Sequence, residues 1–335
     1  MLTRRLALAA AASAVLAGPA FAADYPWKPE RPITIIVPWA AGGATDQVTR
    51  LAAAEIEAAL GQKVVIVNQP GATGSIGTKN ALEAPKDGYT LTAGAAQDLG
   101  TYKVTGMLGT ELKDWHLFLT VANVPVFSVN ANSPHKDLAA LLAAMKARPN
   151  GVTIATAGVG SAGHAAMETL ARAAGVTYRH VTYDGGNPAV VATVAGETDA
   201  TSQLAGEQAE MIRGKRLRPL AALSDKPLEL SGVGAIPPVT QTVASLKPPT
   251  NFFGIFVPKG VPQPVVATLE QVWRDKVMTS DKLKAYATER GALFAPSTGA
   301  QAEEAALPAV RANAWILFDT GKAKVSPETV GLPRG

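Results

Sequence analysis

The sequence predicts an α/β protein of two lobes with a cleft between them, and three observations lead to this fold class. β-Branched runs alternate with glycine-opened helical segments, which is the pattern of parallel sheets covered by helices. The pattern occurs in two stretches of similar size, which a long extended segment separates. The 335 residues correspond to about two domains, since a domain averages roughly 150 residues.

The first 22 residues predict a cleaved secretory signal peptide. Arg4 and Arg5 precede an apolar run over residues 6–18, and Ala20-Phe21-Ala22 provides a small-residue cleavage site. The apolar run is too short to span a bilayer, which takes about 20 apolar residues. The paired arginines leave two export routes open, general secretion and twin-arginine export. We therefore expect a periplasmic protein.

Composition excludes several classes of protein. Hydrophobic residues make up 47% and charged residues 17%, so the chain can bury a proper core. Cysteine is absent, which excludes disulfides, thiol nucleophiles and cysteine metal sites. The net charge of +4 falls to +2 once the two signal arginines are removed, and a nearly neutral protein is not expected to bind nucleic acid.

The first α/β unit begins after residue 30. Its order is strand 33–37, helix 45–60, strand 64–67, helix 74–84 and strand 89–93, which predicts a parallel sheet with helices on both faces. Gly61 is expected to end the first helix as a C-cap.

The second unit follows an extended segment, 117–129, whose length suggests a connection between lobes. We expect helices at 138–147, 162–174, 188–195 and 207–213 and strands at 152–155, 178–182, 198–202 and 218–223. The strand at 252–257 is expected to return the chain to the first lobe, followed by helices at 265–277, 282–288 and 301–322. The predicted division is 1–22 as signal peptide, 23–124 plus 250–335 as lobe 1, and 125–249 as lobe 2.

Four predicted loops follow strands at their carboxyl ends, where open α/β sheets bind ligands. They cover residues 38–46, 94–98, 157–164 and 183–188, and they are rich in glycine. Glycine lets backbone amides approach a ligand, and a helix start offers unpaired N–H groups with a partial positive charge. These loops therefore suit a carboxylate, although simple strand-to-helix turns use the same residue types.

An enzyme is the competing class. The segment VGSAG at 159–163 resembles a serine nucleophile elbow, but Val159 replaces the first glycine. Only His164 and His180 follow Ser161, both close by, so a serine hydrolase using Ser161 is the less favoured alternative. The histidines lack metal-ligand spacing and the glycines lack nucleotide-binding spacing. We therefore expect no metal, no cofactor and no catalytic residue.

Eight segments stand in a characteristic order. They are YPWKP at 25–29, ITIIVPWAAGGATD at 33–46, LGQKVV at 60–65, NQPGA at 68–72, IGT at 76–78, DGYTL at 87–91, HVTY at 180–183 and FFGIFVPKG at 252–260. Over nearly the whole mature chain they resemble the Bug-type, TctC-like solute receptors of tripartite tricarboxylate transporters. The resemblance implies a type II periplasmic binding protein fold, a Venus flytrap whose lobes close on a small carboxylate.

The resemblance also implies partners. The ligand would be delivered to the membrane permease subunits of a tripartite tricarboxylate transporter, and the receptor is expected to be a monomer. A periplasmic sensor that presents its carboxylate to a sensor kinase would have the same ligand site, so this alternative stays open.

By position, the resemblance implies that both lobes contact the ligand, mainly through backbone amides and ordered waters. The implied contacts are Trp39, Ala41, Gly42, Gly43, Thr45, Asp46, Ala95 and Ala96 on one side, and Gly160, Ser161, His164, Tyr183, Asp184, Gly185, Ser202 and Gln203 on the other.

The chain departs from the family pattern at acidic positions. Asp184 stands where family members usually have a basic residue, and Asp98 and Glu207 lie near other loops of the site. Our hypothesis is that one of these acids faces an amine or hydroxyl of the ligand; the alternative is that Asp184 points to solvent. The segment between Asp98 and Trp115 also departs from the pattern.

Overall fold

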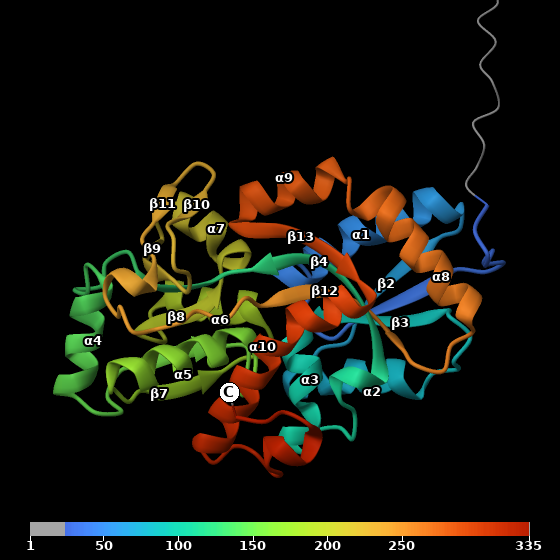
Figure 1. Cartoon of the computed structure of the whole chain (residues 1–335). Helices are drawn as coiled ribbons and strands as arrows, with labels where there is room; N and C mark the ends of the chain where they lie inside the picture. Colours follow the sequence, from blue (N-terminus) through green and yellow to red (C-terminus); the bar gives the residue numbers. More distant parts are fainter. Residues whose placement is uncertain (1–23, 335) are drawn as a thin grey trace, which may run out of the picture.

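The computed structural model describes residues 24–334, which form two lobes side by side, each built on one sheet (Figure 1). The predicted signal peptide, 1–22, lies outside the described residues. Over residues 24–334 no helix combines the length and apolarity needed to cross a membrane. The two-lobed α/β fold expected from the sequence is confirmed.

The larger sheet has six strands in the order β13-β4-β12-β3-β1-β2. Their bounds are β1 (Ile33–Val37), β2 (Val64–Asn68), β3 (Thr90–Ala95), β4 (Trp115–Asn123), β12 (Phe252–Pro258) and β13 (Ala292–Thr298). Strands β1, β2 and β3 are parallel, as the βαβαβ pattern predicts, whereas β12, β4 and β13 run antiparallel to their neighbours. We refer to this sheet and its helices as the first lobe.

The helices of the first lobe come from both ends of the chain. They are α1 (Ala44–Leu60), α2 (Ser75–Glu83), α3 (Ala96–Thr105), α8 (Gln263–Val272) with a π-helical turn at Trp273–Val277, α9 (Asp281–Arg290) and α10 (Gly299–Asp319). Gly61 ends α1 with a left-handed φ of 65°, as predicted.

The predicted loop at 94–98 is wrong. Strand β3 continues to Ala95 and α3 begins at Ala96 without a connecting loop. Helix α3 is missing from the predicted elements because Gly100 in its middle is a poor helix former. The structure shows why glycine stands there: a Cβ on Gly100 would lie 2.5 Å from the side chain of Val310 on α10.

The second lobe has five strands in the order β7-β6-β8-β5-β9. Its elements are β5 (Pro125–Asn130), α4 (Leu138–Ala147), β6 (Thr153–Thr156), α5 (Ala162–Ala174), β7 (Arg179–Thr182), α6 (Gly186–Ala195), β8 (Ala200–Leu204), α7 (Ala205–Arg213) and β9 (Leu217–Ala222), with a hairpin of β10 (Leu228–Leu230) and β11 (Gly234–Ile236). The sequence prediction matches these helices and the five strands of the sheet closely, and it omits the hairpin.

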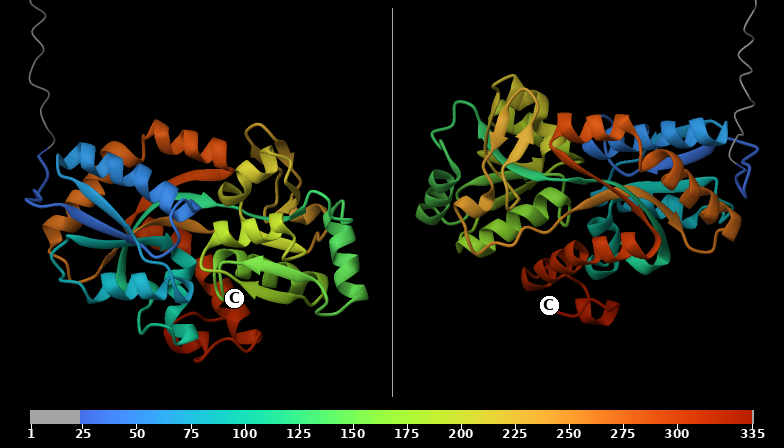
Figure 2. Two further views of the ribbon diagram at one scale, coloured as in Figure 1. Left: turned by 180° about the vertical axis from the view of Figure 1, so that it is seen from behind. Right: turned by 45° about the horizontal axis from the view of Figure 1, so that its top comes forward.

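Two chain segments cross between the lobes. The predicted extended segment 117–129 is two strands, β4 and β5, which belong to different sheets and are separated only by Val124. The second crossing leads from the second lobe into β12 (Figure 2). The backbone N–H of Asn123 donates to the carbonyl of Asn251 at 3.1 Å, so the two crossings lie against each other.

Each lobe has its own core. Trp273 is fully buried in the first, where its ring packs 5.1 Å from that of Phe118 and its indole N–H donates to the carbonyl of Leu119. Phe127 and Leu170 are buried in the second. Burying a side chain of this size contributes roughly 1.5–3 kcal/mol, so apolar packing is a main source of stability in each lobe, which has no disulfides.

The last helix contacts both lobes. Helix α10 packs on α3 and β4 and also touches α5 of the second lobe, as Figure 1 shows for the red helix between them. Asn313 on α10 donates from its amide to the carbonyl of Gly160 at 3.1 Å. The C-terminal segment therefore bridges the lobes.

Candidate functional site

A small cavity lies where helix starts from both lobes meet. It is lined by Trp39, Thr45, Asp98, Ala157, Ser161, Ala162, Gly186, Gln203, Leu204, Glu207 and Phe253. Its volume is about 20 Å³, and a neighbouring space of about 10 Å³ shares Trp39 and Asp98 with it. A water needs roughly 10–15 Å³ by this kind of measure, so the lobes are closed on each other in this structure.

Glycines allow the two lobes to approach this closely. A Cβ on Gly185, whose φ is +136°, would lie 3.1 Å from the Cβ of Ala40 in the first lobe. A Cβ on Gly158, whose φ is +120°, would lie 2.7 Å from the hydroxyl of Thr73 in the first lobe. The closed arrangement therefore depends on the absence of side chains at these positions.

Five helices begin at the cavity. Thr45 belongs to the first turn of α1, Asp98 to that of α3 and Glu207 to that of α7, while Ala162 and Gly186 are the first residues of α5 and α6. The first turn of a helix carries unpaired N–H groups and a partial positive charge. Converging helix starts from both lobes form a site for a negatively charged group.

Two acidic side chains reach the same cavity. Burial raises the pKa of Asp98 to about 8, against the opposing effect of a hydrogen bond from Gln97. Burial likewise raises the pKa of Glu207 to about 7, although the backbone N–H groups of Ala44 and Leu204 favour its ionised form. Both acids are therefore partly protonated near neutral pH.

The side-chain amide of Gln203 links Glu207 to the backbone at Ala157. With the amide oriented to satisfy both ends, its nitrogen donates to Oε2 of Glu207 at 2.8 Å and its oxygen accepts from the backbone N–H of Ala157 at 2.6 Å. Glu207 also accepts from the N–H of Leu204 at 3.3 Å. These bonds fix the Glu207 carboxyl at the cavity wall.

The structure brings only part of the expected contact set to the cavity. Of those residues, Trp39, Thr45, Ser161 and Gln203 line it, and Ala95 lines the neighbouring space. The other expected residues are not in its lining: Ala41, Gly42, Gly43, Asp46, Ala96, Gly160, His164, Tyr183, Asp184, Gly185 and Ser202.

Several of these residues hold the loops in shape. Asp46 accepts from the N–H of Gly42 at 2.9 Å and pairs with Arg50; although burial opposes it, these bonds lower its pKa. The hydroxyl of Ser202 donates to the carbonyl of Gly163 at 2.8 Å. Nδ1 of His164 accepts from the N–H of Gly160 at 3.1 Å. Their side chains fix the shape of the loops next to the cavity.

The side chains of Tyr183 and Asp184 point away from the cavity. The Tyr183 hydroxyl donates to Glu197 at 3.3 Å, and the Asp184 side chain is exposed. Of the two readings of Asp184 from the sequence, the structure shows the solvent-facing one. Helix α6 begins at Gly186 rather than at Pro188, so the loop that carries these residues is shorter than predicted.

Five lining residues were not among the expected contacts: Ala157, Ala162, Gly186, Leu204 and Phe253. Ala162, Gly186 and Leu204 are next to expected contacts, and Ala157 begins the predicted loop 157–164, so a position at a helix start or strand end was the available signal. Phe253 belongs to the returning strand β12, far along the chain from all the glycine loops, and nothing local in the sequence places it at the cavity.

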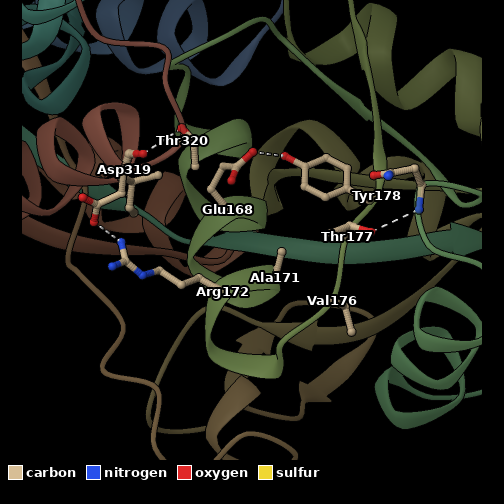
Figure 3. Close-up of a pocket in the computed structure, with 10 residues that line it drawn as sticks. Glu168, Ala171, Arg172, Val176, Thr177, Tyr178, Asp319 and Thr320 are labelled. Atoms are coloured by element: carbon tan, nitrogen blue, oxygen red, sulfur yellow. Dashed lines mark hydrogen bonds and ion pairs between the residues drawn. The ribbon is translucent and has the colours of Figure 1, made fainter.

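A larger groove of about 450 Å³ lies between α5, β7 and the end of α10 (Figure 3). Its polar groups already bond to each other: Tyr178 donates to Glu168 at 2.9 Å, and Arg172 pairs with Asp319. No helix starts among its lining residues. The cavity at the helix starts is therefore the candidate ligand site.

The expected absence of a metal site and the alternative role of Ser161 as a nucleophile can be compared with the described residues. Across residues 24–334, no three His, Asp or Glu side chains are grouped so that they could hold a metal ion. The Ser161 hydroxyl accepts from the N–H of His164 and caps α5, so it serves the helix.

Comparison with known proteins decides the family. The model described as "Tripartite tricarboxylate transporter family receptor" matches residues 48–292. This chain belongs to that family.

Individual relatives agree with this assignment. The chain is 31% identical over 287 residues to Protein BugT of Bordetella pertussis, covering 83% of this chain and 85% of that protein. Its structure resembles that of the periplasmic binding protein BugD, with a TM-score of 0.80, 25% identity, and coverage of 88% of this chain and 99% of that one. It also resembles MatC from Rhodopseudomonas palustris with bound malate, with a TM-score of 0.73, 25% identity, and coverage of 88% and 98%. The chain is a solute-binding receptor of this family and not an enzyme.

Proposed function

We propose that this receptor binds a small carboxylate in the cavity between its lobes, in the periplasm, and delivers it to the permease subunits of a tripartite tricarboxylate transporter. The observation that carries the proposal is the meeting of five helix starts from both lobes at one closed cavity. Malate bound to MatC is a small carboxylate of the proposed class. Residues 1–22 would be removed on export.

Binding would use backbone more than charged side chains. We assign the carboxylate to the N–H groups in the first turn of α5, with ordered waters completing the contacts. Gly42, Gly43 and Gly185 would contribute by close backbone approach, and Trp39 and Ser161 by lining the space. Asp46, His164 and Ser202 would act by holding the loops.

Closure would couple binding to transport. We propose 23–124 plus 250–335 as lobe 1, 125–249 as lobe 2, and the crossings near 122–129 and 249–253 as the hinge. A ligand drives closure only through higher affinity for the closed state, so it must touch both lobes. The cavity lining, with Thr45 from one lobe and Ala162 from the other, meets this condition.

The substitution Ala162→Leu tests the site. Ala162 is 7% exposed and lines the cavity, so the larger side chain would fill space that the ligand needs. We expect titration calorimetry with a panel of small carboxylic acids, malate among the plain ones and aspartate among those with an amino group, to show one-to-one binding of at least one acid by the wild type. The variant should bind about 100-fold more weakly, because overpacking costs about 1–3 kcal/mol.

The matched control is Ala173→Leu, which makes the same change on the exposed side of α5 and should leave binding unchanged. Equal affinity in wild type and Ala162→Leu would place the ligand elsewhere. Absence of binding across the whole acid panel would contradict the proposed function.

A further inference from the structure

Two carboxyl groups face the proposed ligand cavity without a cationic partner. Among residues 24–334, neither Asp98 nor Glu207 forms an ion pair with a lysine, arginine or histidine side chain. Most other acids of comparable burial in the described chain are paired, as Glu111 is with Lys103 and Lys113. Buried carboxylates are normally paired because burying an unpaired charge is costly.

Asp98 is aimed into the cavity. Its side chain is 6% exposed and lines both the main cavity and the neighbouring space. The hydrogen bond that it accepts comes from the amide of Gln97 at 3.5 Å, which is at the limit of such a bond. The Asp98 carboxyl is therefore left with capacity to accept from a donor in the cavity.

Glu207 reaches across the cleft to the first lobe. It lies on α7 of the second lobe, and its carboxyl accepts from the backbone N–H of Ala44, the first residue of α1. A Cβ on Gly43 would lie 3.5 Å from its Oε1. In the closed state the start of α1 is thus already occupied by a carboxyl group of the chain itself.

The cavity therefore combines two kinds of lining group. Asp98 and Glu207 are acidic, whereas Ser161 and Ala162 belong to the start of α5, which favours an anion. A plain dicarboxylate would bring negative charge against the two acids. A molecule that carries both a cation and a carboxylate would match both kinds of group.

On the basis of the proposed function, we propose that the ligand is a carboxylate that also bears an ammonium group. Asp98 and Glu207 bind the ammonium, and the first turn of α5 binds the carboxylate. The two acids are thus specificity-determining residues that separate amino acids from plain carboxylic acids.

The other titratable groups near the acids stay fixed between pH 6 and 8. Tyr102 faces Asp98, and burial together with that carboxyl raises the pKa of Tyr102 further above its ordinary value. Tyr286 on α9 faces Glu207; burial together with Glu207 raises the pKa of Tyr286, although Arg290 opposes this rise. In this range only Asp98 and Glu207 are expected to change charge at the cavity.

Calorimetry with three pairs of acids tests the proposal: succinate and aspartate, glutarate and glutamate, and propionate and 3-aminopropionate. Each pair differs only by an amino group. We expect the amino member of at least one pair to bind at least tenfold more tightly at pH 7. Its affinity should increase from pH 6 to 8, because the ammonium favours the ionised acids and binding releases protons.

Proton release is a separate readout, obtained by repeating the titration in two buffers of different ionisation enthalpy. Asp98→Asn and Glu207→Gln should each reduce the preference for the amino member and the number of protons released. Asp184→Asn, at an exposed acid of a neighbouring loop, should change neither.

Opposite results overturn the proposal in distinguishable ways. Binding of succinate, glutarate or malate without a preference for an amino member, or an amino preference that survives in both variants, contradicts the inference and leaves the proposed function standing. Binding of none of these acids contradicts the proposed function and the inference together.

Discussion

We expect Gly163→Ala to lower the free energy of unfolding by about 3 kcal/mol or more, the upper end of the cost of overpacking a core. Gly163 lies in the first turn of α5, directly against strand β8. A Cβ there would lie 2.1 Å from the backbone oxygen of Ser202 and 2.9 Å from the side chain of Gln203. The backbone oxygen belongs to a strand paired on both sides, so it cannot move without disturbing the sheet.

Chemical denaturation measures this effect, with Gly109→Ala as the matched control. A Cβ on Gly109 meets no atom within 4 Å, so that variant should be as stable as the wild type. The added Cβ would also push α5 away from β8, and this movement would displace Ser161 and Ala162 at the ligand cavity. Equal stability of the two variants would show that α5 and β8 pack less closely than the structure has them.

The second large loss of stability is expected from the substitution Lys322→Met. Lys322 follows α10, and its ammonium donates to Glu168 on α5 at 2.9 Å. The Glu168 side chain is 13% exposed and that of Lys322 is 31% exposed, so the pair is shielded from solvent. Removal of the cation leaves a buried carboxylate with too few partners, and we expect a loss of about 2 kcal/mol at pH 7.

The pH dependence of this stability loss shows whether the Glu168 carboxylate causes it. Although burial opposes it, hydrogen bonds from His164 and Lys322 hold the pKa of Glu168 at about 2, below its ordinary value of 4.5. A lowered folded-state pKa stabilises the fold above pH 4.5, and this contribution is lost as the pH falls toward 2. The difference between wild type and Lys322→Met should therefore be constant above pH 5 and shrink below it.

Lys63→Met is the control for Lys322→Met. Lys63 forms a pair with Glu57 in which both side chains are well exposed, so its removal should change stability little. Two results would contradict the stabilisation of the second lobe by the Lys322–Glu168 pair. One is a Lys322→Met variant that is as stable as Lys63→Met at pH 7. The other is a loss of stability in Lys322→Met that persists unchanged at pH 3.

The parts of the fold that the sequence predicted share a local cause. Strand β1 and helix α1 follow from a β-branched run, a helical apolar period and the left-handed cap at Gly61. Strand β13 was missed because it is an edge strand, mostly half-buried and interrupted by Pro296, so no alternating pattern marks it. Helix α3 was missed because Gly100 is selected by packing on α10, far along the chain.

The site was predictable to the same degree. Glycine-rich helix starts are visible in the sequence, and they do meet at the cavity. The direction of an acidic side chain is not visible: Asp46 and Asp98 both stand in the first turn of a helix, yet Asp46 turns to Arg50 while Asp98 faces the cavity. That difference depends on which neighbours the tertiary fold provides.

Occupancy of the cavity between the lobes is measured most directly by native mass spectrometry of the protein exported to the periplasm and purified without unfolding. We predict one small carboxylic acid per chain, carried through purification or restored by adding it, in the wild type and in Ala173→Leu but not in Ala162→Leu. A protein that neither retains nor takes up a small acid, or that holds it equally well in Ala162→Leu, would contradict a ligand site at these helix starts.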